Sequence, residues 1–269
     1  MRRSIWLSLA LGLALAGARS ALATDYWDVT APPDSFGFTQ NELIHGTSQQ
    51  HDLQTIPGPV ADDDWYIVIN SPRSSYEAVV DSPSQNIHMY NLTNLARFDI
   101  GGSLLQVSEF ATVGATFGYS TALRWQNTGT TFDQQYLRVQ SQFCAVSCLA
   151  SDQYHIRFYE TTVSIPRFNN ASGQVTVLII QNSTSWTRDI AGTAYFHNAA
   201  GTLLGSTTFS LAANAALVLN TATVPGVAGV GGTIKVAHDG GYGNLAMKAV
   251  ALEPATGFSF DTPGLYKPK

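Results

Sequence analysis

The amino-acid sequence predicts an all-β fold, arranged as two consecutive β-sandwiches after a cleaved signal peptide. Short segments rich in β-branched and aromatic residues recur along almost the whole chain beyond residue 60, separated by turn-forming residues. No segment of the mature chain keeps the i, i+3, i+4, i+7 apolar pattern of a helix for more than about two turns. The chain is 45% hydrophobic and only 12% charged, a composition that excludes a disordered protein.

Residues 1–23 are typical of a secretory signal peptide. Arg2 and Arg3 give a positive start, an apolar run covers residues 5–18, and an Ala-Leu-Ala cleavage site precedes Thr24. The apolar run is shorter than the roughly 20 residues of a membrane-spanning helix, although a retained anchor stays an alternative. We therefore expect a mature chain that begins at Thr24, is exported to the periplasm or the extracellular medium, and does not insert into a membrane.

The charge balance excludes nucleic acid as a partner. Removal of the leader takes away three arginines and no acidic residue, so the formal net charge falls from −5 to −8. Proteins that bind nucleic acid need clustered Lys and Arg to neutralise phosphates, and an acidic chain of this kind lacks them.

The predicted strands are spaced as in a sandwich protein. In the first half of the chain they cover residues 65–69, 75–80, 104–110, 122–126, 135–140 and 154–161. In the second half they cover residues 175–181, 192–198, 207–211, 216–220, 233–237 and 248–252. Asn-Thr-Gly, Ala-Ala-Gly-Thr and Asp-Gly-Gly-Tyr-Gly separate several of them as turns.

A boundary between two domains is expected around Pro166. Proline cannot donate to a central ladder, and the Asn-Asn-Ala-Ser-Gly that follows is typical of a turn or linker. The sequence thus predicts a first sandwich over 24–163, a linker over 164–173 and a second sandwich over 174–269.

Two cysteines, Cys144 and Cys148, are expected to form a disulfide in an oxidising compartment. A metal site would need further ligands, and His155 stands alone in the sequence near them. The pair lies between the predicted strands 135–140 and 154–161, which we expect to form a hairpin around it.

No catalytic motif is found in the sequence, so we expect a protein that is not an enzyme and needs no cofactor. The pairs His51-Asp52 and His238-Asp239 could each supply part of a Ser-His-Asp site, but both lie near turn residues. The alternative from another class is a secreted hydrolase, with an active site built from loops between the two sandwiches.

Five stretches follow the order of a known family's motifs. They are NEL (41–43), ADDDWY (61–66), SYEAVVD (75–81), QYLRV (135–139) and YHIR (154–157). Over residues 38–163 this order resembles the bacterial pre-peptidase C-terminal domain, with the opening Glu-Asn of that family reversed. The resemblance implies a jelly-roll-like sandwich that usually accompanies secreted peptidases and in some members binds matrix polymers or Ca²⁺. Residues 170–262 are similar to immunoglobulin-like sandwiches of no particular family.

A calcium site is predicted at the acidic run Asp62, Asp63 and Asp64, which precedes a strand. Ca²⁺ takes oxygen ligands from carboxylates, amides and carbonyls, and Asn41 and Glu42 could complete the shell as in some relatives. The alternative is a solvated turn, because Asp is a good turn former.

A candidate binding face is predicted from residues that alternate out of the strands 135–140 and 154–161. The face would combine rings that stack with donors that form hydrogen bonds, which suits a polymer ligand. Its residues are Tyr136, Arg138, His155, Arg157 and Tyr159. The alternatives are an ordinary exposed sheet or a face covered by the second domain. The sequence as a whole predicts a secreted, non-catalytic binding, adhesion or structural protein that recognises an extracellular polymer such as a glycan or a matrix protein.

Overall fold

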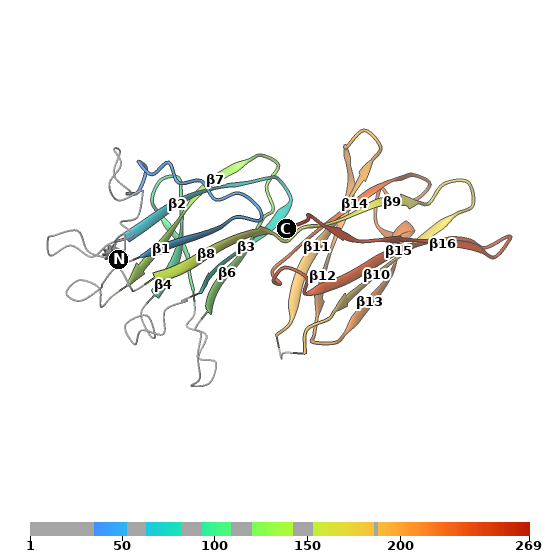
Figure 1. Ribbon diagram of the computed structural model, residues 1–269. Coiled ribbons are helices and arrows are strands. Elements are labelled where there is room, and N and C mark those ends of the chain that lie inside the picture. The colour runs from blue at the N-terminus through green and yellow to red at the C-terminus, as the bar shows by residue number, and fades with distance from the viewer. Residues whose placement is uncertain (1–34, 53–62, 82–92, 109–119, 142–152, 186–187) are drawn as a thin grey trace, which may run out of the picture.

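The structure is a computed structural model that describes residues 35–52, 63–81, 93–108, 120–141, 153–185 and 188–269. Among these residues the chain forms four antiparallel sheets, which confirms the predicted all-β class. Figure 1 shows the sheets as two sandwiches that lie side by side, with the C-terminal end of the chain between them. No helix in the described ranges is long and apolar enough to cross a membrane.

The first sandwich contains two four-stranded sheets. One has the order β1 (Ser48–Asp52), β8 (Gln153–Glu160), β3 (Ser74–Asp81) and β6 (Ser120–Asn127). The other has the order β2 (Asp63–Asn70), β7 (Asp133–Ser141), β4 (Thr93–Asp99) and β5 (Leu104–Val107).

The core of this sandwich follows from the alternation of side chains along each strand. Along β8, Tyr154, Ile156 and Phe158 are buried while His155 and Arg157 are partly exposed, as the sequence predicts. The buried residues form one apolar cluster between the two sheets.

The second sandwich pairs a four-stranded sheet with a five-stranded one. The first has the order β13 (Ala216–Asn220), β10 (Val175–Asn182), β15 (Leu245–Glu253) and β16 (Phe258–Pro263). The second has the order β12 (Leu203–Leu211), β11 (Ile190–Asn198), β14 (Gly231–His238), β9 (Val163–Asn169) and β17 (Leu265–Tyr266). A single 3₁₀ turn, η2 (Thr221–Thr223), is described after β13, and a separate apolar cluster fills this sandwich.

The predicted linker over 164–173 is wrong for most of its length. Residues 163–169 form strand β9 of the second sandwich, and Ile165 and Phe168 on it are buried in the core. Pro166 is tolerated because the register of β9 against β14 shifts between Ile165 and Phe168, so a bulge removes the need for a ladder donor. Only Thr161 and Thr162 separate β8 from β9, and both are buried.

Candidate functional site

The five residues of the predicted binding face do not share one face. Strand β7 pairs with β2 and β4, whereas β8 pairs with β1 and β3, so the two strands lie in opposite sheets and the predicted hairpin is wrong. Tyr136 and Arg138 lie on one sheet, and His155, Arg157 and Tyr159 lie on the other. Cys144 and Cys148 fall outside the described residues, so their disulfide stays a prediction.

Arg138 is packed between aromatic rings on the outer face of its sheet. Its guanidinium carbon lies 5.3 Å from the ring centre of Phe98 and 5.7 Å from that of Trp65. A carboxylate oxygen of Asp63 lies 3.7 Å from a terminal guanidinium nitrogen of Arg138 and forms an ion pair with it. Tyr136 packs beside them, with its ring centre 4.9 Å from that of Phe36. These contacts explain why Tyr136 is only 6% exposed and cannot serve as an open stacking surface.

On the opposite sheet, the side chains of His155 and Arg157 each have a partner, although Nε of Arg157 has none among the described residues. His155 shares a hydrogen bond with Gln50, and Arg157 pairs with Asp81. Tyr159 is covered by the second sandwich. For Tyr159 the alternative of a face covered by the second domain therefore holds.

The acidic run is divided between the two faces of β2. Asp64 points into the core, where the hydroxyl of Tyr154 donates to its carboxylate. Asp63 points outward to Arg138, and burial raises its pKa although the nearby guanidinium lowers it. Glu42 is exposed, and the described residues include no group of three or more His, Cys, Asp or Glu that could hold a metal ion.

Asn41 is fully buried, and neither polar atom of its side chain has a hydrogen-bond partner among the described residues. Asp62 lies outside the described residues. The calcium site therefore stays a prediction, although Asp63 and Asp64 do not point to one place.

Both histidines of the two His-Asp pairs are held by structural contacts. Nε2 of His238 donates to the carbonyl of Thr161 at 2.8 Å, and Nδ1 accepts from the backbone N–H of Gly240 at 3.1 Å. Burial lowers the pKa of His238 to about 4, so the ring is neutral at physiological pH. The ring of His51 stacks on Tyr154, and its Nε2 bonds Gln49.

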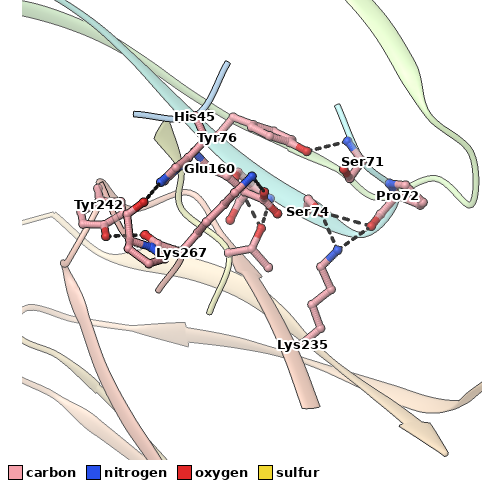
Figure 2. A network of polar contacts seen from close by, with 12 residues as sticks. His45, Ser71, Pro72, Ser74, Tyr76, Glu160, Lys235, Tyr242 and Lys267 are labelled. Carbon is pink, nitrogen blue, oxygen red and sulfur yellow. Dashed lines mark hydrogen bonds and ion pairs between the residues drawn. The ribbon is translucent and has the colours of Figure 1, made fainter. Parts of the chain in front are cut away.

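A dense set of polar contacts joins the two sandwiches. Nζ of Lys235, on β14, donates to the carbonyl of Pro72 at 2.9 Å and to Oγ of Ser74 at 2.6 Å in the first sandwich (Figure 2). The C-terminal segment adds further contacts, because Lys267 lies 3.6 Å from the carboxylate of Glu160. His45 donates from Nε2 to the carbonyl of Pro268.

A cavity of about 660 Å³ opens at this junction. The first sandwich contributes Arg124 from β6. The second contributes described residues between β10 and β11, on either side of residues 186–187, and the loop between β14 and β15. The lining residues are Arg124, Ser183, Thr184, Ser185, Arg188, Ile190, Gly240, Gly241, Gly243 and Asn244. None of these ten residues carries a carboxylate.

Glu77 holds Arg124 in place at the cavity. One carboxylate oxygen accepts from Nε of Arg124 at 2.7 Å and lies 2.6 Å from a terminal guanidinium nitrogen. The other oxygen accepts from the backbone N–H of Tyr242, in the second sandwich, at 3.0 Å. Gly241 makes this approach possible, because a Cβ there would lie 2.7 Å from the carboxylate of Glu77. The charge of Arg124 is thus fixed at the boundary of the two sandwiches.

Arg188 is held more loosely on the other side. Its side chain is 56% exposed, and its guanidinium lies 3.9 Å from the carboxylate of Asp239, beyond hydrogen-bond distance. Asp239 uses the other carboxylate oxygen to accept from the N–H of Ala191 at 2.8 Å.

Hydrogen bonds from Asn182 shape the loop that carries the three hydroxyl residues. Its amide nitrogen donates to the carbonyls of Arg188 and Leu211, and its amide oxygen accepts from both the N–H and the hydroxyl of Thr184. Ser183 donates from both N–H and Oγ to the carbonyl of Asn244, which links the two loops. The cavity wall is therefore a formed structure that presents hydroxyl, amide and guanidinium groups.

Sequence reasoning missed this site. The Asp-Gly-Gly-Tyr-Gly stretch at 239–243 indicates a turn, and glycines there are consistent with close approach. The side chains that approach these glycines, Glu77 and its partner Arg124, belong to the first sandwich. A single sequence carries no signal for this contact between the two sandwiches.

Comparison with known proteins does not assign the chain to a family. No family model matches it, and no curated protein matches it, so the resemblance over 38–163 stays a prediction.

Among solved structures, the full extracellular region of zebrafish Gpr126/Adgrg6 is similar at 10% identity and a TM-score of 0.26, over 82% of this chain and 30% of that one. A glycosyl hydrolase family 2 member from Bacteroides cellulosilyticus is similar at 9% identity and a TM-score of 0.21, over 80% of this chain and 31% of that one. A β-glucuronidase from glycoside hydrolase family 2 is similar at 7% identity and a TM-score of 0.18, over 75% of this chain and 24% of that one. The chain thus spans about a third or less of the length of these proteins.

Proposed function

We propose that this protein is a secreted, non-catalytic binding protein of the extracellular space, and that the cavity at the junction of its two sandwiches is its ligand site. The observation that carries the proposal is the cavity itself, which is lined by hydrogen-bond donors from both sandwiches. Its volume falls in the range of ~300–1,000 Å³ that is usual for small-molecule sites, so it suits one unit of a polymer such as a glycan. The leader at residues 1–23 supports export.

The chemistry around the cavity supports binding over catalysis. A hydrolase with a loop-built site would need a base that is free to take a proton. Both ring nitrogens of His238 are engaged, and the carboxylates of Glu77 and Asp239 are held by guanidinium and backbone groups. These groups are occupied by contacts within the protein, whereas the donors of the lining residues remain to face a ligand.

The test is a binding screen of the mature protein against glycans, collagen-like peptides and cell-wall polymer fragments, with and without Ca²⁺. A Ser185→Trp variant places a large ring in the cavity wall at an exposed position. Ser259→Trp is the matched control, because it adds the same ring at an exposed position on β16, away from the cavity. We expect Ser185→Trp to abolish the binding that wild type and Ser259→Trp share. Binding that survives in Ser185→Trp would place the ligand elsewhere and refute the proposed site.

A further inference from the structure

The described lining residues of the cavity combine two guanidinium groups with hydroxyl and amide groups, and none of them is acidic. Arg124 has five N–H donors, and Glu77 occupies those on two of its nitrogens, so donors remain for a ligand. Arg188 donates one long hydrogen bond, of 3.4 Å, to the backbone carbonyl of Asp239 and none to its carboxylate. Its exposed side chain can exchange that bond for a ligand in the cavity that it lines. The wall therefore offers guanidinium donors to a ligand, although each guanidinium also lies beside a carboxylate of the protein, Glu77 or Asp239.

Such a wall favours a ligand rich in acceptors. Each hydroxyl of a neutral sugar donates one hydrogen bond and accepts up to two. Its donors would be matched by carboxylates in the wall, which are lacking among the described lining residues. A carboxylate is matched by guanidinium groups, which bind it through parallel N–H···O bonds.

The remaining lining groups suit a hydroxylated ring. Thr184 and Ser185 on one loop and Asn244 on the other can exchange hydrogen bonds with ring hydroxyls, while Ile190 offers an apolar contact for ring C–H groups. We propose, building on the function proposed above, that the cavity binds a carboxylated sugar unit, with its carboxylate on Arg188 and Arg124 and its hydroxyls on the loop residues.

The experiment is a calorimetric titration of the mature full chain with two matched probes, methyl galacturonoside and methyl galactoside. They share one ring and differ in a carboxylate against a hydroxymethyl group. We expect galacturonoside to bind at least tenfold more tightly than galactoside, and its affinity to fall as salt is raised. Acetate and inorganic sulfate, which carry the charge without the ring, should bind at least tenfold more weakly than galacturonoside.

Arg188→Gln is the variant of choice, because Arg188 is exposed and its loss leaves the Glu77–Arg124 pair intact. We expect a loss of tenfold or more in galacturonoside affinity with an unchanged melting temperature. Arg167→Gln is the matched control, since Arg167 is also exposed in the second sandwich but lies over the ring of Phe260 outside the cavity. Its affinity should equal that of wild type.

The outcomes separate this inference from the function on which it rests. Equal affinity for both sugars, equal affinity for sulfate or acetate, or full binding by Arg188→Gln would overturn the carboxylated-sugar assignment. If galacturonoside fails to bind while polymer binding still disappears in Ser185→Trp, this inference is wrong and the proposed function stands. If galacturonoside does not bind and Ser185→Trp still binds the polymer, both this inference and the proposed function are wrong.

Discussion

Glu77 holds one side chain from its own sandwich and one backbone amide from the other, so a single carboxylate fixes the wall of the cavity. It is almost fully buried, and its partner Arg124 is about three-quarters covered. Breaking a buried pair leaves an uncompensated charge, which is more harmful than losing an exposed pair.

We expect Glu77→Gln to lower the free energy of unfolding by about 2–4 kcal/mol, because Arg124 loses its counter-charge. Asp261→Asn breaks the exposed Lys248–Asp261 pair and should change stability by about 0–1 kcal/mol. Urea unfolding of the two variants measures the difference. Equal stabilities would show that Glu77 has no special role at the junction.

His238 makes stability depend on pH. Its folded-state pKa is lowered from 6.5 to about 4 by burial, so the unfolded chain takes up a proton first as the pH falls. This contribution to stability is complete above pH ~6.5 and is lost as the pH falls toward 4. We expect the stability gap between wild type and His238→Asn to narrow by about 3 kcal/mol between pH 7 and pH 4. A stability difference between wild type and His238→Asn that stays constant with pH would contradict the lowered pKa of His238.

At the scale of elements, β9 shows how a sequence signal can be overridden. Pro166 and the polar residues after it predict a linker, but Ile165 and Phe168 on the same segment are fully buried. Burial of two large apolar side chains outweighs one missing ladder donor, which the bulge accommodates.

If β9 belongs to the core, Ile165→Ala should lower the free energy of unfolding by about 2–5 kcal/mol. The neighbouring Arg167→Ala changes an exposed side chain on the same strand and should cost less than about 1 kcal/mol. Thermal unfolding followed by circular dichroism compares the two. A small effect of Ile165→Ala would restore the linker interpretation.

Periodicity predicts the strands but not their partners. Every segment predicted as a strand contains or overlaps a strand of the structure, because alternation and β-branched residues are local signals. The polar β1 was missed, since Ser-Gln-Gln-His-Asp has no apolar alternation. The predicted hairpin of β7 and β8 failed because neighbours in sequence joined different sheets. For the same reason the residues of the predicted binding face lie on two different sheets. The cavity beside Arg124 could not be predicted either, because it depends on which segments meet in space.

For the whole molecule, the junction makes the two sandwiches one unit. Lys235 reaches two acceptors of the first sandwich, and burial lowers its pKa, while Tyr242 packs between Tyr159 and Tyr266. Because polar contacts of this kind link two separate cores, we expect unfolding of the wild type to be cooperative across both.

Lys235→Met removes both hydrogen bonds and leaves Pro72 and Ser74 without this donor. We expect calorimetry to resolve the single transition of wild type into two, one for each sandwich. Lys248→Met, which removes an exposed lysine, should keep one transition. A single unchanged transition in Lys235→Met would show that the junction does not couple the cores.

The proposed function requires that a ligand binds where the two sandwiches meet. The most direct test is a titration of the ¹⁵N-labelled mature protein with methyl galacturonoside and with each polymer fragment that the screen identifies, followed by backbone amide shifts. We predict that the largest shifts fall on Ser183, Gly241 and Asn244, together with Arg124 across the junction. Shifts confined to the outer faces of either sandwich, with these amides unmoved, would contradict it.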